Sequence, residues 1–140
     1  MLRAVIDPGV LVSALLAPTG SPAQLYERWV AGEFELVVCP HLLDELDSVL
    51  RRPKFRRYAT LDEVEHYVEV LRGGASSAPD PEPSPGLTRD PADDYLVALA
   101  RAARVDYLVA GDADLTDLTG LVPPVCSPAA FLSRLTPTSN

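Results

Sequence analysis

The amino-acid sequence predicts an α/β fold with a central parallel sheet of four to five strands. Short apolar runs that end at turn residues or at proline alternate with segments of helical periodicity along the chain. This alternation is typical of β-α-β units, whose parallel strands are covered by helices on both faces. A length of 140 residues fits one domain. We expect that domain to span residues 1–135, with 136–140 as a frayed tail.

Four segments have the composition of strands. The first, Arg3–Ile6, ends at the turn residues that follow Ile6. The others are Glu35–Cys39, which stops at Pro40, then Tyr107–Ala110 and Pro123–Cys126. The proline-rich stretch Ala75–Gly86 is expected to be a loop in extended form.

Helix signals separate these strands. Ser21 is the predicted N-cap of a helix that Gly32 stops. Thr60 and Glu63 have the spacing of a capping box, which opens a helix that runs to Gly73 and Gly74. The remaining predicted helices are 10–16, 42–50, 92–104 after an N-cap at Asp90, and 128–135 after an N-cap at Ser127.

Composition narrows the classes of function. With 47% hydrophobic residues and a net charge of −8, the chain is typical of a globular protein and not of one that coats nucleic acid non-specifically. No apolar run reaches the length of a membrane span, and the N-terminus reads directly into a strand. We therefore expect a cytoplasmic protein without membrane contact, in which Cys39 and Cys126 are buried free thiols.

Acidic residues gather where the strands are predicted to end. Ligand sites of parallel sheets lie at the carboxyl ends of the strands. Asp7 follows the first strand, and either Glu45 or Asp47 flanks the apolar face of the helix after Cys39. The other acids of this set are Asp112 and Asp114, after the strand 107–110, and Asp90, Asp93 and Asp94, at the start of the helix 92–104.

Carboxylates that converge repel one another unless some are protonated or a multivalent cation lies between them. Hard oxygen ligands suit Mg²⁺ or Mn²⁺, ions that lower the pKa of bound water and stabilise an in-line phosphoryl displacement. The pattern therefore predicts a metal-dependent phosphodiesterase. The competing interpretation treats each acid separately, as a turn or helix cap or as a solvated helix residue.

A second pattern is basic and aromatic. Five of the twelve Lys and Arg residues fall in one short stretch that also contains Phe55 and Tyr58. They could contact a nucleic-acid backbone while a base stacks on one of the rings. The alternative is a solvated helix end with Phe55 in the core. The basic residues are Arg51, Arg52, Lys54, Arg56 and Arg57.

Three other sites are weighed and disfavoured. His41 and Glu45 are one turn apart and could ligate a metal, but no second His is near, so His41 is expected to be exposed. No glycine-rich phosphate loop is present. A phosphoryl-accepting receiver would need a lysine near the later strands, and Lys54 is the single lysine.

Six stretches of this chain resemble the PIN-domain family, and more closely the branch that contains the toxins of toxin–antitoxin systems. They cover nearly the whole chain with the spacing of the family intact. These stretches are Val5–Ala14, Phe34–Pro40 with Leu43–Leu46, Arg51–Phe55, Arg89–Asp94, Asp106–Leu115 and Ser127–Phe131.

The resemblance implies a PIN-like α/β/α sandwich and a Mg²⁺- or Mn²⁺-dependent endoribonuclease that leaves a 5′-phosphate and a 3′-hydroxyl. It implies an RNA substrate, a cognate antitoxin in a type II pair, and a homodimer. It favours Glu45, as the group that positions or deprotonates the attacking water, over Asp47. The family's catalytic acids map onto Asp7, Glu45, Asp93 and Asp112, and its metal ligands onto Asp7, Asp93, Asp112 and Asp114.

The choice between Asp93 and Asp94 stays open. The family's acid lies seven residues before a helix alanine, here Ala100, which favours Asp93. On a helix Asp93 would also flank the apolar stripe of Leu96 and Leu99, whereas Asp94 would point away from it.

The chain departs from the family pattern at two places. Pro8 and Gly9 replace the usual Thr or Ser and Asn after the first acid, and Ala110 replaces a Thr or Ser before the last. Side chains at such positions orient ligands, and losing them weakens a site. The alternative function is therefore a catalytically silent PIN-like module that binds RNA or a partner protein.

Overall fold

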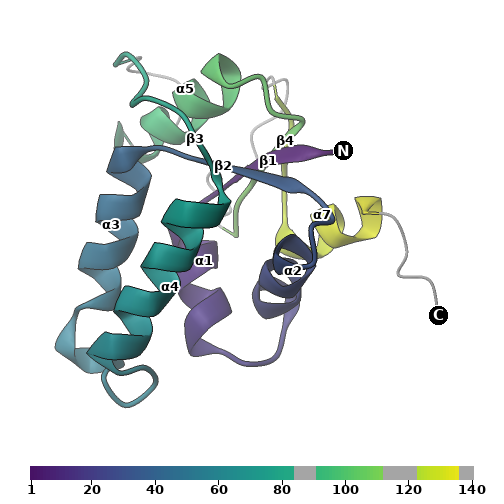
Figure 1. The fold of residues 1–140 in the computed structure, drawn as a ribbon. Coiled ribbons are helices and arrows are strands. Elements are labelled where there is room, and N and C mark those ends of the chain that lie inside the picture. Colours follow the sequence, from purple (N-terminus) through teal and green to yellow (C-terminus); the bar gives the residue numbers. More distant parts are fainter. Residues whose placement is uncertain (84–90, 112–122, 136–140) are drawn as a thin grey trace.

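The computed structural model describes residues 1–83, 91–111 and 123–135 (Figure 1). Predictions that fall on other residues lie outside this part of the chain. They include the N-cap at Asp90, the frayed tail 136–140, and the positions of Asp112 and Asp114.

Five parallel strands form the sheet, in the order β3-β2-β1-β4-β5. The predicted α/β fold with a parallel sheet is confirmed. Because all strands run the same way, their carboxyl ends meet at one edge of the sheet. The strands are β1 Arg3–Ile6, β2 Glu35–Val38, β3 Ser76–Ser77, β4 Tyr107–Val109 and β5 Val125–Cys126.

Strand β3 corrects the expectation of a loop over residues 75–86. Ser76 and Ser77 pair with Val37 and Val38 of β2, and the Ala78 amide donates to the Val38 carbonyl at 2.8 Å. This strand lies at the sheet edge, where backbone hydrogen bonds hold it without an apolar side-chain pattern. The two serines therefore give no periodic signal.

Six α-helices surround the sheet within the described residues. Figure 1 shows α5 on one face of the sheet and α1 to α4 on the other. The 3₁₀ turn η1, Pro53–Phe55, follows α3, and η2, Pro91–Asp93, precedes α5. The helices are α1 Pro8–Leu16, α2 Ser21–Val30, α3 Pro40–Leu50, α4 Leu61–Gly74, α5 Asp94–Ala102 and α7 Pro128–Arg134.

Capping residues define most of the helix starts. The Thr60 hydroxyl accepts from the Glu63 amide and the Glu63 carboxylate from the Thr60 amide, both at 3.1 Å, so the predicted capping box is confirmed. Ser127 caps α7 as predicted. The N-cap of α2 is Gly20 and not Ser21. Gly20 has a φ of 109°, in the region that favours glycine. The helix therefore begins at Ser21, one residue earlier than predicted.

The core lies between the sheet and its helices. Val5, Leu36 and Leu108 of the strands are almost fully buried, as are Leu42 and Leu46 of α3. Cys39 and Cys126 are buried free thiols, as predicted. In the part of the chain that the structure describes, no helix has the length and apolar character needed to cross a bilayer.

Candidate active site

Asp7 lies at the carboxyl end of β1, where the chain turns into α1. Its amide donates to the Val109 carbonyl of β4 at 2.8 Å, which ties it to the neighbouring strand. Its carboxylate caps α1, because Oδ1 accepts from the Gly9 amide at 3.0 Å. Pro8 starts α1 at a position where no amide hydrogen is needed. The residues after Ile6, which were predicted as a turn, therefore begin α1, and this helix starts two residues before the predicted start at Val10.

Glu45 lies in α3 and is joined to α5 by Tyr95. The Tyr95 hydroxyl donates to Glu45 Oε2 at 3.2 Å, and both residues are half-buried. Burial raises the pKa of Tyr95, and the negative charges of Glu45 and Asp7 raise it further. Asp7 follows β1, and Glu45 lies in the second turn of α3, which follows β2, so both lie toward the carboxyl edge of the sheet. Asp47 is instead paired with Arg51 at 2.9 Å.

Asp93 and Asp94 lie at the start of α5. Asp93 occupies the N-cap position and is half-buried. Asp94 is 6% exposed, and it is the buried charged residue among the described residues. The expectation that Asp94 points away from the apolar face is wrong. Val97 and Ala98, one turn further, are buried as well, so the covered part of α5 is wider than one stripe.

The end of β4 lies beside the start of α1. Ala110 is buried, and its amide donates to the Cys126 carbonyl at 3.0 Å. A Cβ at Gly111 would come within 3.8 Å of a Val10 methyl group. Gly111 thus brings the chain next to the first turn of α1, which Asp7 caps. Asp112 and Asp114 follow in the sequence but lie outside the described residues.

Two residues at the carboxyl edge of the sheet were not predicted from the sequence as part of the site. Tyr95 is one, and Asp80, which follows β3, is the other. Asp80 Oδ1 accepts from the His41 amide at 2.8 Å, in the first turn of α3. The His41 side chain is exposed, as predicted, and its ring lies 4.2 Å from the Tyr95 ring, centroid to centroid. The sequence signal that could have indicated Tyr95 is an aromatic hydroxyl next to acids at a predicted helix start. Asp80 lies in the proline-rich stretch, where no sequence signal indicates it.

The donors at this edge are carboxylate oxygens, the ligands that Mg²⁺ and Mn²⁺ prefer. Within residues 1–83, 91–111 and 123–135, no three His, Cys, Asp or Glu side chains are grouped closely enough to hold a metal ion. The described acids therefore suit such an ion in the chemistry of their oxygens, but they do not by themselves form a metal site.

The basic stretch forms the tip between α3 and α4, which we call the basic tip and define as residues 51–58. Arg51 pairs with Asp47 and with Glu65 of α4, at 2.9 and 3.4 Å. Arg56 turns inward and donates to the Leu50 carbonyl, while its Nε and Nη1 are buried. The other three basic side chains, Arg52, Lys54 and Arg57, are exposed.

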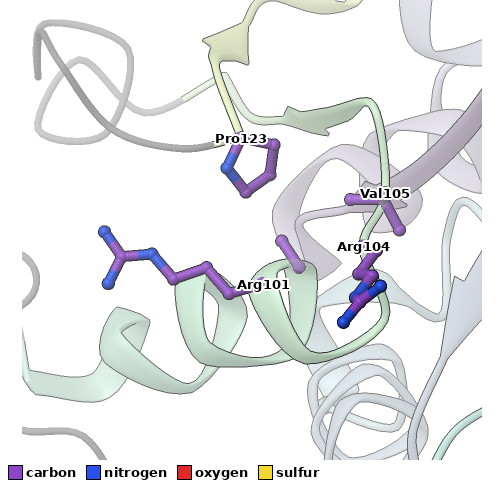
Figure 2. Close-up of a pocket in the computed structure, with 5 residues that line it drawn as sticks. Arg101, Arg104, Val105 and Pro123 are labelled. Atoms are coloured by element: carbon purple, nitrogen blue, oxygen red, sulfur yellow. The ribbon is translucent and has the colours of Figure 1, made fainter.

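A hollow of about 380 Å³ is lined by residues of α5 and of the segments that precede β4 and β5 (Figure 2). Val105 and Pro123, which line it, precede β4 and β5, so the hollow is at the amino edge of the sheet. Ala100, Arg101 and Arg104 complete its lining. It is therefore separate from the carboxyl edge where Asp7 and Glu45 lie.

Comparison with known proteins identifies the family. A family model for the PIN domain matches residues 3–114. The chain belongs to the PIN-domain family. Members of this family are typically nucleases, and the resemblance seen in the sequence is confirmed. This PIN domain is also similar to the uncharacterized protein MJ1680 of Methanocaldococcus jannaschii, with 25% identity over 119 residues, which are 84% of this chain and 75% of that protein.

Solved structures share the fold. PAE2754 from Pyrobaculum aerophilum has a TM-score of 0.66 at 17% identity, covering 95% of this chain and 94% of that one. VapBC2 from Rickettsia felis, bound to a DNA fragment from its promoter, has a TM-score of 0.61 at 12% identity, covering 90% and 98%. VapC20 of Mycobacterium tuberculosis, a toxin that cleaves the sarcin-ricin loop, has a TM-score of 0.57 at 13% identity, covering 86% and 97%.

Proposed function

We propose that this PIN domain is a Mg²⁺- or Mn²⁺-dependent endoribonuclease and the toxin of a type II toxin–antitoxin pair. The observation that supports the proposal is the position of two acids at the carboxyl edge of the sheet: Asp7 follows β1, and Glu45 lies in the second turn of α3, where Tyr95 of α5 donates to it. Carboxylates in this place suit a hard divalent cation, and the family consists typically of nucleases.

Each acid has a role in this proposal. Asp7 and either Asp93 or Asp94 would hold the cation, with Asp112 and Asp114 from the segment after β4. When bound, the cation would lower the pKa of a water molecule and stabilise the charge of the reacting phosphate. Glu45 would position that water and accept its proton, with Oε2 held by Tyr95 and Oε1 left for the water.

The toxin assignment is supported by similarity to toxin structures. VapC20 is a toxin that cleaves the sarcin-ricin loop, and the structure of VapBC2 contains a DNA fragment from its promoter. By analogy, the partners would be an RNA substrate, a cognate antitoxin and a second copy of this chain, all in the cytoplasm. The neighbouring gene should then encode a small antitoxin.

A cleavage assay tests the activity. We expect the purified protein to cut a structured RNA in the presence of Mn²⁺ and to leave a 5′-phosphate on the product. Asp7→Ala and Glu45→Gln should each reduce the rate at least about a hundredfold, because each removes a group that acts on the reacting atoms. Asp44→Asn, an exposed acid on the same helix as Glu45, is the matched control and should cleave like wild type. Equal cleavage by wild type and Asp7→Ala would indicate a contaminating nuclease and remove the enzymatic proposal.

The second candidate is a catalytically silent PIN-like module that binds RNA or a protein. It is favoured by the capping bond from Gly9 to Asp7 Oδ1, which occupies one oxygen of a proposed ligand, and by the buried Ala110, which has no hydroxyl to orient a ligand. RNA binding without Mn²⁺-dependent cleavage by wild type would support this candidate.

A further inference from the structure

We propose that the basic tip is a binding site for single-stranded RNA, in which a base stacks on Tyr58 while Arg52, Lys54 and Arg57 contact phosphates. This inference rests on the proposed function, because it names the substrate class of the same protein: RNA with unpaired bases.

The structure separates the cations that are available at the tip from those that are not. Arg51 is held by Asp47 and Glu65, and Arg56 is turned toward Leu50. The exposed side chains of Arg52, Lys54 and Arg57 form no ion pair with any acid of the described residues. The tip itself contains no acid, in a chain of net charge −8. Attraction for a polyanion is therefore concentrated at these three side chains.

The two aromatic residues of the tip also differ in how accessible they are to a ligand. The sequence leaves Phe55 and Tyr58 as alternative stacking residues. Phe55 is half-buried, whereas Tyr58 is 58% exposed, so Tyr58 is the ring that a base can reach. The Arg57 guanidinium carbon lies 5.7 Å from the Tyr58 ring centroid, and Lys54 Nζ lies 5.0 Å from that of Phe55. A cation beside an aromatic ring matches the alternation of phosphate and base along a strand.

The tip is held in shape before any ligand arrives. The Arg56 amide donates to the Pro53 carbonyl at 3.1 Å, and the Ala59 amide donates to the Phe55 carbonyl at 3.0 Å. The Arg56 guanidinium bonds the Leu50 carbonyl at the carboxyl end of α3, where a positive charge is favoured. A platform ordered in this way loses little conformational entropy when it binds.

The tip is joined to Glu45 by α3. Glu45 precedes Leu50, the last residue of α3, by five positions, which is about 8 Å along a helix axis. The tip begins directly after Leu50, so it continues the helix that carries Glu45.

The test measures RNA binding without cleavage. A fluorescently labelled poly(U) of 20 nucleotides is titrated with the full chain in the presence of EDTA. Binding is followed by the fluorescence anisotropy of the RNA over a range of salt concentrations. The tip variant replaces Arg52, Lys54 and Arg57 by Gln. The matched control replaces Arg72, Arg101 and Arg104 by Gln, which removes the same charge from other exposed positions. Thermal unfolding of each variant verifies that it folds.

We expect the tip variant to bind at least about tenfold more weakly than wild type, and to reduce the slope of log K against log salt by about 2. The control variant should stay within about threefold of wild type. Tyr58→Ala should weaken binding about tenfold, while Tyr58→Phe, which keeps the ring, should bind like wild type. A 20-base-pair RNA duplex, whose bases are already stacked, should show no dependence on Tyr58.

Three results would overturn the inference: equal loss in the tip and control variants, unchanged binding by Tyr58→Ala, or binding of poly-glutamate in place of RNA. The last result would make the tip a site for an acidic protein. A protein that binds RNA through the tip but shows no Mn²⁺-dependent cleavage would keep this inference and lose the proposed function.

Discussion

The Tyr95 hydroxyl donates a hydrogen bond to Glu45 Oε2 at 3.2 Å and so joins α5 on one face of the sheet to α3 on the other. A hydrogen bond to a carboxylate is stronger than one between neutral groups. The bond also keeps Glu45 toward the carboxyl edge, where Asp7 follows β1.

This bond predicts an energetic coupling between the two side chains. In a double-mutant cycle of Tyr95→Phe and Glu45→Gln, we expect a coupling free energy of about 1–2 kcal/mol, measured by urea unfolding. Tyr26→Phe, which removes a hydroxyl from another half-buried tyrosine, should change stability by less than about 0.5 kcal/mol. Additive effects of Tyr95→Phe and Glu45→Gln would contradict the bond.

Burial of Asp94 predicts which acid at the start of α5 binds the cation. Asp94 is buried whereas Asp93 is half-buried, so solvent would screen a cation at Asp94 less than one at Asp93. We expect Mn²⁺ at a hundredfold excess over its Kd to stabilise wild type by about 2–3 kcal/mol in thermal unfolding. Asp94→Asn should abolish this gain and Asp93→Asn should retain most of it. The reverse result would support Asp93, the residue that the family resemblance favours.

Two neighbouring glycines at the end of α4 predict different effects of the same substitution. A Cβ at Gly73 would meet nothing within 4 Å, whereas one at Gly74 would lie 3.1 and 3.2 Å from two ring carbons of Trp29. We expect Gly73→Ala to stabilise the protein by about 0.5–1 kcal/mol through the lower entropy of the unfolded chain. Gly74→Ala should lose this gain and shift the fluorescence of Trp29, the single tryptophan. Equal stabilisation by both variants would show that the Trp29 ring can move aside without a loss of stability.

Burial raises the pKa of the Cys39 thiol to about 11, and nearby Asp80 adds to the rise. Since the folded state favours the protonated thiol, this contribution to stability is present below pH 9 and is lost as the pH rises toward 11. In Cys126→Ala, where Cys39 is the remaining thiol, we expect a thiol reagent at pH 9 to react at least about fiftyfold more slowly with folded than with urea-unfolded protein.

The matched control for this pH dependence is the variant that lacks both thiols. Its free energy of unfolding should fall less steeply between pH 9 and pH 11 than that of Cys126→Ala. Equal slopes would mean that Cys39 does not contribute to the loss.

Local signals predicted most of the fold. The start of β1 and the capping box of α4 depend on residues next to one another, and both match the structure. Strand β3 depends on Val37 and Val38 for its hydrogen bonds, and its own serines carry no pattern. Its pairing therefore could not be inferred from the residues that form it.

The same distinction holds for the candidate site. Asp7 could be placed from the end of a strand, and the family resemblance favoured Glu45 over Asp47. The hydrogen-bond partners of Tyr95 and Asp80 could not be inferred, because Glu45 and His41 lie 50 and 39 positions away in the chain. The predicted orientation of Asp94 was wrong because one narrow apolar stripe was assumed for α5. This helix is buried around most of its circumference.

The bond from the His41 amide to Asp80 also bears on how α3 is stabilised. Cys39 at the N-cap makes no side-chain capping bond, and the Asp80 carboxylate, 39 positions further along the chain, bonds the first turn of α3 instead. The pairing of β3 with β2 brings Asp80 to this place. The helix that carries Glu45 therefore depends at its beginning on a non-local contact, and we expect a peptide of residues 40–50 alone to fray from that end.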